Sequence, residues 1–240
     1  MSPRALISWS SGKDSAWALN DTRNEGVLDI VGVLTTVTQP YGRVSMHWVR
    51  ESVLAQQVKR IGLPLFPVYL PAPCSNETYQ ARMAEVLGAR REEGTTHVVF
   101  GDLFLEDVRG YREKQMTAAG MTPVFPLWHR DTAQLAREML AQGLEATVTV
   151  VDPRQLDPAF AGRSYDATLL DDLPEGVDPC GERGEFHTVV TDGPMFDSPI
   201  PVAVGDVVER DGFVFADVVL SAECGVRCAE NSVPKDRGTP

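Results

Sequence analysis

Cysteines are few in this sequence, and long apolar runs are missing. The 240 residues include only Cys74, Cys180, Cys224 and Cys228, which are too scattered to form a disulfide framework in a chain of this length. No apolar stretch reaches the length of a transmembrane helix. Residues 1–9 lack the basic and then long apolar pattern of a secretory signal peptide. We therefore expect a cytoplasmic protein that has no contact with a membrane.

Positive charge is also scarce. The chain has 22 Lys and Arg against 34 Asp and Glu, a formal net charge of −12. Affinity for nucleic acids comes largely from Lys and Arg, so a general nucleic-acid binder is not expected. A hydrophobic share of 43% is ordinary for a globular protein, and a chain of this length can bury a substantial core. This balance favours an enzyme with a local basic pocket.

The sequence has no internal repeat and no linker rich in Gly and Ser, but it has a clear alternation of elements. Amphipathic helical patterns over residues 54–61, 79–87 and 135–140 separate short apolar segments. Ser75 or Asn76 and Asp131 or Thr132 supply caps for two of these helices. The strands are expected at residues 5–9, 30–36, 65–70, 97–100, 123–125 and 146–151. Such an alternation predicts an α/β fold with a parallel sheet and helices on both faces.

The pattern changes after about residue 151. Turn-rich segments surround three apolar segments that read as strands, at residues 186–191, 202–208 and 213–220. We therefore predict a smaller α+β domain that packs on the first and helps to form the site. The predicted domains are residues 1–127 and 128–240, with a frayed end at residues 232–240.

The segment Ser10–Ser15 lies where the first strand should turn into the first helix. Backbone N–H groups at a helix start attract anions, the small residues let a phosphate approach, and Lys13 adds a mobile positive charge. A Walker motif requires a Gly five residues before the Gly-Lys pair and Ser or Thr after the Lys, where this chain has Ile7 and Asp14. The segment therefore predicts a phosphate site of another type. The alternative is an ordinary capped turn with a surface lysine.

Three further groups of residues carry chemistry. Asp102 follows the strand at 97–100 and could hold Mg²⁺ or, alternatively, cap the next helix. Residues 178–188 combine carboxylates, a thiol and an imidazole in a glycine-punctuated loop, which could bind a cation or orient a substrate carboxylate through Arg183; the alternative is a charged hairpin. Cys224 and Cys228, with Cys180, are expected to be inert thiols rather than a metal or sulfur-transfer site. Of the histidines, only His187 lies in such company, and His97 is expected in the core.

Ser10–Ser15 resembles the S-G-G-x-D-S loop of the PP-loop ATP pyrophosphatases. More narrowly, Gly101-Asp102 and the segments 106–113, 126–132 and 180–188 resemble the diphthine–ammonia ligase family, in the same order and across most of the chain. Ser11 replaces a glycine of the usual loop, which would strain the turn if that position has a positive φ. Phe186-His187-Thr188 follows the pattern of bacterial relatives, in which the acceptor would be a carboxylate other than diphthine.

The resemblance implies a Rossmann-like fold of the adenine nucleotide alpha hydrolase (HUP) type and an AMP-forming carboxylate–ammonia ligase that uses ATP and Mg²⁺. It implies Lys13, Asp14 and Asp102 as catalytic residues, with Asp14 and Asp102 also holding Mg²⁺. The implied ATP contacts are Ser8, Ser10, Ser11, Gly12, Lys13, Asp14, Ser15, Leu34, Thr35 and Gly101. The implied substrate contacts are Trp128, Gly181, Glu182, Gly184, Glu185 and His187.

The resemblance also implies partners. These are ATP, ammonium and a carboxylate substrate, which is the diphthine of elongation factor 2 in an archaeal or eukaryotic protein. The quaternary ammonium of diphthine could be recognised by acidic groups or by the face of Trp128. A homodimer is left open. Two other functions stay in view: a PP-loop enzyme that adenylates RNA for thiolation, and a non-catalytic protein that binds adenine nucleotides.

Overall fold

The strand at the centre of the first sheet is β1 (Arg4–Ser8), in which Ala5, Leu6 and Ile7 are fully buried. The computed structural model, which describes residues 2–223, places β1 in a sheet of order β3-β2-β1-β5-β6, with β4 also paired to β2. The other strands are β2 (Asp29–Thr38), β3 (Arg43–Val44), β4 (Leu65–Leu70), β5 (Thr95–Val99) and β6 (Thr122–Val124). Because a central parallel strand is covered on both faces, its sequence is continuously apolar.

Helices cover both faces of this sheet, as predicted. Ala5 and Ile7 share one core with residues of α1 (Lys13–Glu25) and α2 (Glu51–Ile61), whereas Leu6 shares the other with α3 (Asn76–Glu92) and α4 (Glu106–Ala118). Successive strand residues point to opposite faces, so β1 alone contributes to both cores. Ser75 caps α3 and Asp131 caps α5 (Thr132–Ala141), in agreement with the capping patterns.

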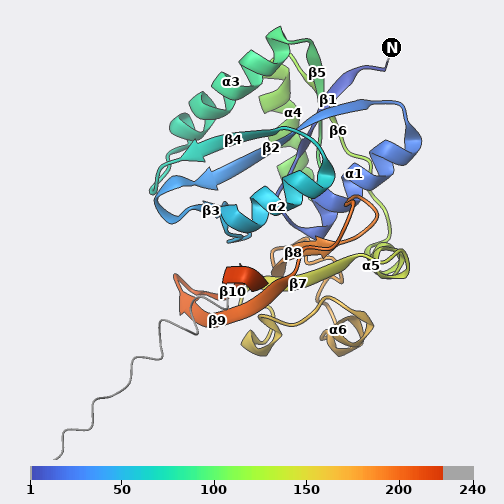
Figure 1. Ribbon diagram of the computed structural model, residues 1–240, viewed down its shortest axis with the longest axis vertical. Helices are drawn as coiled ribbons and strands as arrows, with labels where there is room; N and C mark the ends of the chain where they lie inside the picture. Colours follow the sequence, from blue (N-terminus) through green and yellow to red (C-terminus); the bar gives the residue numbers. More distant parts are fainter. Residues whose placement is uncertain (1, 224–240) are drawn as a thin grey trace, which may run out of the picture.

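The second sheet is antiparallel throughout, with the order β8-β7-β10-β9. Its strands are β7 (Glu145–Val151), β8 (Phe186–Asp192), β9 (Val202–Arg210) and β10 (Phe213–Leu220), accompanied by η2 (Pro158–Phe160) and α6 (Ala167–Asp172). Figure 1 shows α1 and α2 on the side of the first sheet that faces the second. Residues of both sheets belong to one apolar core, so the smaller region packs against the first, as expected. The boundary at residues 127 and 128 stays a prediction.

The first sheet differs from the prediction in one strand. β3 pairs antiparallel with β2 through Val37–Val44 and Thr38–Arg43, after the short η1 (Gln39–Tyr41). A strand of only two residues has no measurable periodicity, which is why the pattern did not reveal it. Cys224, Cys228 and the predicted frayed end lie outside the described residues. Within residues 2–223, no helix is long and apolar enough to cross a membrane.

Candidate active site

The loop between β1 and α1 has a left-handed residue at Ser11, with a φ of 72°. This is the position where a glycine is usual in the resembled loop, so the expected strain is present. The Ser11 carbonyl accepts hydrogen bonds from the backbone N–H of Val190 at 2.9 Å and from Nε2 of Gln57 at 3.1 Å. Gln57 is fully buried and also accepts from Trp9 Nε1 at 3.0 Å. These bonds fasten the strained loop to α2 and β8.

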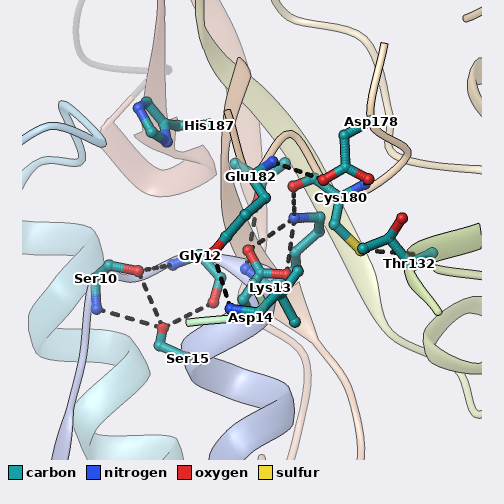
Figure 2. Close-up of polar contacts among 12 residues, drawn as sticks. Ser10, Gly12, Lys13, Asp14, Ser15, Thr132, Asp178, Cys180, Glu182 and His187 are labelled. Carbon is teal, nitrogen blue, oxygen red and sulfur yellow. Dashed lines mark hydrogen bonds and ion pairs between the residues drawn. The ribbon is translucent and has the colours of Figure 1, made fainter. Parts of the chain in front are cut away.

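Backbone N–H groups of this loop donate hydrogen bonds to side-chain hydroxyl oxygens. The Gly12 N–H donates to Ser10 Oγ at 3.3 Å, and the Lys13 N–H donates to Thr188 Oγ1 at 3.2 Å. The Ser15 hydroxyl contacts Ser10 Oγ at 3.1 Å and donates to the Gly12 carbonyl at 2.9 Å (Figure 2). These N–H groups lie at the positive end of α1, and their hydrogen bonds to the hydroxyl oxygens are long. An anion of suitable size could take the place of the hydroxyl oxygens as the acceptor.

Lys13 is not the mobile charge that the loop pattern predicted. Its side chain is 2% exposed, and Nζ donates to the two carboxylate oxygens of Asp14 at 2.9 and 2.8 Å and to the Cys180 carbonyl (Figure 2). Nζ also lies 5.6 Å from the ring centres of both Tyr165 and Phe186. Burial alone would lower the pKa of Lys13, but Asp14 and its other acidic neighbours outweigh burial and raise it. The lysine is a fixed cation beneath the second domain.

Three carboxyl groups meet above this lysine. Burial raises the pKa of Asp14 in spite of the nearby Lys13. Glu182 Oε1 accepts from the backbone N–H groups of Leu103 at 2.8 Å and Phe104 at 3.4 Å. Burial raises the pKa of Glu182 to about 7, and the charges of Asp14 and Asp102 add to this effect. The pKa of Glu182 therefore depends on both aspartates as well as on its burial.

Asp102 does not cap a helix, which removes the alternative reading of this residue. α4 begins at Glu106, and its N-cap position is Leu105. The Asp102 carboxylate instead accepts from Arg112 Nε at 3.2 Å. Gly101, beside it, packs on the start of α1, where an added Cβ would lie 2.6 Å from the carbonyl carbon of Asp14. The end of β5 and the start of α1 thus meet without a side chain between them.

A cavity of about 650 Å³ joins these groups. Both domains contribute to its wall, from the loop after β1 to the loop before β8. Eleven of the predicted site residues line it: Ser8, Ser10, Lys13, Asp14, Ser15, Gly101, Asp102, Gly181, Glu182, Gly184 and His187. Ser11 and Gly12 are buried in the loop itself and shape it from behind. The structure therefore brings together segments that are up to 179 residues apart in the chain, from Ser8 to His187.

Two predicted nucleotide contacts lie elsewhere. Leu34 is 3% exposed and Thr35 is 2% exposed, both within the sheet, whereas Thr36 lines the cavity in their place. The backbone carbonyl of Leu34 accepts from the Trp9 N–H at 2.8 Å. Thr36 lies on the same face of β2 as Leu34, two residues further along, whereas Thr35 faces the other side of the sheet. Nucleotide contacts of Leu34 and Thr35 stay a prediction.

Two predicted substrate contacts also lie outside the cavity wall. The guanidinium of Arg109 covers Trp128, 4.6 Å from the ring centre, so that face of the indole is already occupied by a cation. Glu185 is 2% exposed, and its carboxylate accepts from the N–H groups of Asp178 at 3.0 Å and Arg183 at 2.9 Å. Glu185 holds the loop together from inside, which a sequence pattern cannot distinguish from substrate binding.

Several cavity residues were not predicted, and His47 is the most notable. It lies between β3 and α2, flanked by Met46 and Trp48, which have φ values of 67° and 60°. Its ring occupies the space that a side chain at Gly12 would fill, with Cε1 2.4 Å from the added Cβ position. A lone histidine in an irregular segment gives no periodic signal, so only the Gly12 requirement points to it. His97, expected in the core, is partly exposed and contacts Thr96 Oγ1.

The described part of the chain has no group of three or more His, Cys, Asp or Glu side chains arranged to hold a metal ion. Asp14 and Asp102 are the two carboxylates predicted for Mg²⁺, and each contacts a basic side chain, Lys13 or Arg112. Cys180 is buried, and burial raises the pKa of its thiol far above the usual range. A thiol of this kind stays protonated and unreactive.

The chain is similar to known proteins of one family. Residues 131–216 match the family model of the diphthamide synthase C-terminal domain. The diphthine–ammonia ligase of Rattus norvegicus is 31% identical over 163 residues, which cover 65% of this chain and 61% of that protein. The diphthine–ammonia ligase of Homo sapiens is 30% identical over 140 residues, covering 56% of this chain and 52% of that protein.

The match with the Mus musculus diphthine–ammonia ligase is of the same kind, 29% identical over 160 residues and 59% of that protein. The matched part of the chain thus spans between 52% and 61% of the length of these three relatives. The family resemblance read from the motifs is confirmed by these matches.

Proposed function

We propose that this chain, a relative of the diphthine–ammonia ligases, activates a substrate carboxylate with ATP and converts it to an amide with ammonia. The observation that carries the proposal is the shared cavity. The loop Ser10–Ser15 and the loop Gly181–Gly184 line the same 650 Å³ space, although they come from different domains. Nucleotide and acceptor could therefore meet without a large rearrangement.

The start of α1 suits the β- and γ-phosphates of ATP. Its N–H donors, the hydroxyls of Ser10 and Ser15, and the positive end of the helix all face one region. The adenine would then lie toward Ser8 and Thr36, at the carboxyl ends of β1 and β2. Lys13 contributes as a fixed buried charge below the loop rather than as an arm that follows the phosphates.

Asp14 and Asp102 would hold Mg²⁺ together with phosphate oxygens. Mg²⁺ is commonly bound by one or two carboxylates plus substrate phosphates, so this pair is a sufficient donor set. When bound, the ion would supply positive charge to the departing pyrophosphate. Asp14 would exchange part of its contact with Lys13 for this role, and Asp102 part of its contact with Arg112.

The reaction has two displacements. The substrate carboxylate oxygen attacks the α-phosphorus of ATP, the bond to the β-phosphate breaks, and pyrophosphate leaves. Ammonia then attacks the acyl carbon, the bond to AMP breaks, and the amide, AMP and one proton are released. The chain would contribute alignment and fixed positive charge, which are the main contributions of a site of this kind.

The acceptor is a carboxylate, and diphthine is the first candidate because the relatives are named for it. Diphthine carries a quaternary ammonium group, and Glu182 is the acidic group of the cavity placed to face it from the loop before β8. Trp128 is less suited to this role because Arg109 already covers it.

The experiment incubates the protein with ATP, Mg²⁺, ammonium and elongation factor 2 that carries diphthine. AMP and pyrophosphate in equal amounts, with a mass change on the factor that corresponds to amide formation, are the expected products. ADP and phosphate as the only products would contradict adenylation, and binding of ATP without any product would indicate a nucleotide-binding protein. Asp14→Asn should lower AMP formation about a hundredfold while the fold is kept.

A sulfur-transfer enzyme is distinguished by its thiols. Activity that persists after Cys180, Cys224 and Cys228 are each replaced by Ser would exclude that alternative. We expect this outcome, because Cys180 is buried with a raised thiol pKa.

A further inference from the structure

Two histidines form one wall of the cavity. The ring centres of His47 and His187 are 4.6 Å apart and the ring planes are inclined by 38°. His47 comes from the segment between β3 and α2, and His187 comes from β8. Both line the cavity that holds the loop at the start of α1. Neither histidine has a role in the two displacements of the proposed reaction.

The hydrogen bond of His47 fixes its tautomer. Nδ1 lies 2.9 Å from the backbone carbonyl of Thr188, and a carbonyl oxygen only accepts, so Nδ1 carries the hydrogen. In a neutral ring, Nε2 is then the atom with the free lone pair. The ring also packs on Gly12, where no side chain could be added without displacing it. Nε2 of His47 is therefore an acceptor held in a fixed place.

Three of the four ring nitrogens of this pair lack a hydrogen bond to the described part of the chain. Among residues 2–223, neither Nε2 of His47 nor either ring nitrogen of His187 has a protein hydrogen-bond partner. Polar atoms in such partly enclosed surroundings usually have a partner. In neutral rings, Nε2 of His47 and one ring nitrogen of His187 are acceptors, and the other nitrogen of His187 is a donor. Two unpaired acceptors on one cavity wall thus point to a small ligand that donates hydrogen bonds.

The surroundings of the two histidines favour neutral groups over cations. Burial lowers the pKa of His47 to about 4, and the buried Lys13 adds to the effect. Burial lowers the pKa of His187 to about 3, with further lowering by His47 and Lys13. Both rings are neutral at pH 7, and the same surroundings oppose any other cation. The carboxylates Asp14, Asp102 and Glu182 belong to another part of the wall, where a cation would be favoured.

We infer that the His47–His187 pair is the binding site for the nucleophile, and that it binds neutral NH₃ rather than NH₄⁺. This inference rests on the proposed function. NH₃ donates a hydrogen bond to Nε2 of His47 and keeps its own lone pair for the acyl carbon. As the carbon–nitrogen bond forms and the bond to AMP breaks, the nitrogen loses one proton. That proton passes to the Nε2 lone pair and from there to water.

A direct titration tests the site without any acceptor. Protein labelled with ¹⁵N in its histidines is titrated with ammonium chloride at pH 8.5, with potassium chloride at equal concentration as the reference. A saturable change in the His47 Nε2 resonance with ammonium alone is the expected result. The accompanying change in the His187 ring resonances should be lost in His47→Asn, which keeps an N–H to donate but has no Nε2. His97→Asn, on β5 away from the cavity, serves as the matched control and should keep the response. Equal responses to the two salts would overturn the inference.

Steady-state kinetics provide a second test of the site. In the assay of AMP formation, His47→Asn should raise the KM for ammonium by about tenfold, roughly the loss of one hydrogen bond, with the KM for ATP unchanged. His187→Phe, which keeps an aromatic ring but has no ring nitrogen, should also raise the KM for ammonium. With wild type, the KM expressed as total ammonium should fall by about tenfold from pH 7 to pH 8, because the NH₃ fraction rises by that factor. A KM that does not depend on pH would indicate that NH₄⁺ binds.

The two proposals fail separately. If wild type forms no AMP, the proposed function is wrong, and the titration alone decides whether the pair binds ammonia. If AMP and amide form while ammonium and potassium give the same resonances, the ligase proposal stands and the histidine site is wrong.

Discussion

A single residue, Ser11, shows how the loop is strained and how the strain is supported. Its φ of 72° suits glycine, and its hydroxyl is buried without a hydrogen-bond partner among residues 2–223. Both features cost free energy, on the order of 1 kcal/mol or more each. Gln57 and Val190 hold the carbonyl of Ser11 and thereby maintain this conformation. The loop's shape depends on its surroundings rather than on its own sequence.

Replacing Ser11 by glycine should therefore stabilise the protein. Ser11→Gly removes both the strain and the unpaired hydroxyl, and we expect the free energy of unfolding to rise by about 1 kcal/mol. Ser11→Ala is the matched control, because it removes the hydroxyl but keeps the strain. Urea unfolding measures both variants. If the alanine variant is as stable as the glycine variant, the positive φ is not the source of the cost.

The histidine pair should make stability depend on pH. The pKa values of His47 and His187 in the folded protein are about 4 and about 3, below the ordinary value of 6.5. At a pH between the lowered pKa of each histidine and 6.5, the unfolded chain binds a proton at that histidine that the folded protein does not bind. Stability from this source is thus complete above pH 6.5 and is lost as the pH falls, by about 1.4 kcal/mol per pH unit for each histidine at most.

Comparison with a variant isolates this effect. Glu182, with its raised pKa of about 7, acts in the opposite direction, since the folded protein binds its proton more tightly. The free energy of unfolding is therefore measured at pH 7.5, 6 and 5 for wild type, His187→Phe and the control His97→Asn. The difference between wild type and His187→Phe should change as the pH falls below 6.5, in favour of the variant. A difference that is constant with pH would show that His187 is not neutral in the folded state.

At the scale of elements, the motifs predicted the arrangement better than they predicted individual contacts. The alternation of strands and helices and the two helix-covered faces of the first sheet follow from apolar periodicity. The Ser10–Ser15 loop lies at a carboxyl strand end of that sheet, as the rule for parallel sheets predicts. The Gly181–Gly184 loop precedes β8 in the antiparallel sheet, and only its composition and the family resemblance pointed to it. Thr36 was missed because an apolar pattern predicts the strand but does not show which of its residues reaches the cavity. His47 was missed because a contact between distant segments leaves no local pattern. Glu185 shows the converse, since a motif residue can serve the loop itself.

Gly101 allows a test of how two elements meet. An added Cβ at Gly101 would lie 2.6 Å from the carbonyl carbon of Asp14 and 2.8 Å from the Ser15 nitrogen, so Gly101→Ala must push the end of β5 away from α1. We expect a loss of about 2 kcal/mol in stability and about tenfold weaker binding of an ATP analogue.

The matched control for this variant is Gly110→Ala. Gly110 lies within α4 and an added Cβ there has no atom within 4 Å, so the change should stabilise the protein by about 0.5 to 1 kcal/mol. Unfolding curves and isothermal titration calorimetry give both quantities. Equal behaviour of the two variants would mean that the contact between β5 and α1 is not tight.

At the scale of the whole molecule, the second domain completes the site that the first domain begins. The Cys180 carbonyl and the rings of Tyr165 and Phe186 surround the buried end of Lys13, which belongs to α1. Thr188 on β8 accepts from the Lys13 N–H and also fixes His47 through its carbonyl. Neither the burial of the lysine nor the histidine wall would exist in the first domain alone. The two sheets therefore build one site together.

An ion cluster connects the two sheets at a second place. Asp217 on β10 accepts from Arg43 on β3 at 2.7 Å and from Arg50 at 2.9 and 2.5 Å. Burial would raise the pKa of Asp217, but the hydrogen bonds and charges of the two arginines outweigh it and lower the pKa to about 2. Because Arg43 and Arg50 flank the segment that carries His47, the cluster also determines where that histidine lies.

Asp217→Asn should therefore weaken the connection between the domains and disturb the cavity. We expect the free energy of unfolding to fall by about 2 to 3 kcal/mol at pH 7, less than for a fully buried pair because the cluster is partly exposed. The loss should shrink as the pH falls toward 2, where the wild-type carboxylate becomes protonated as well.

The control is Asp197→Asn, which removes a 3.6 Å ion pair between a largely exposed residue and Arg60. It should change stability by less than about 0.5 kcal/mol. Calorimetry measures stability, and the His47 Nε2 resonance reports the cavity. A variant that loses stability but keeps that resonance would show that the cluster joins the domains without positioning the histidine.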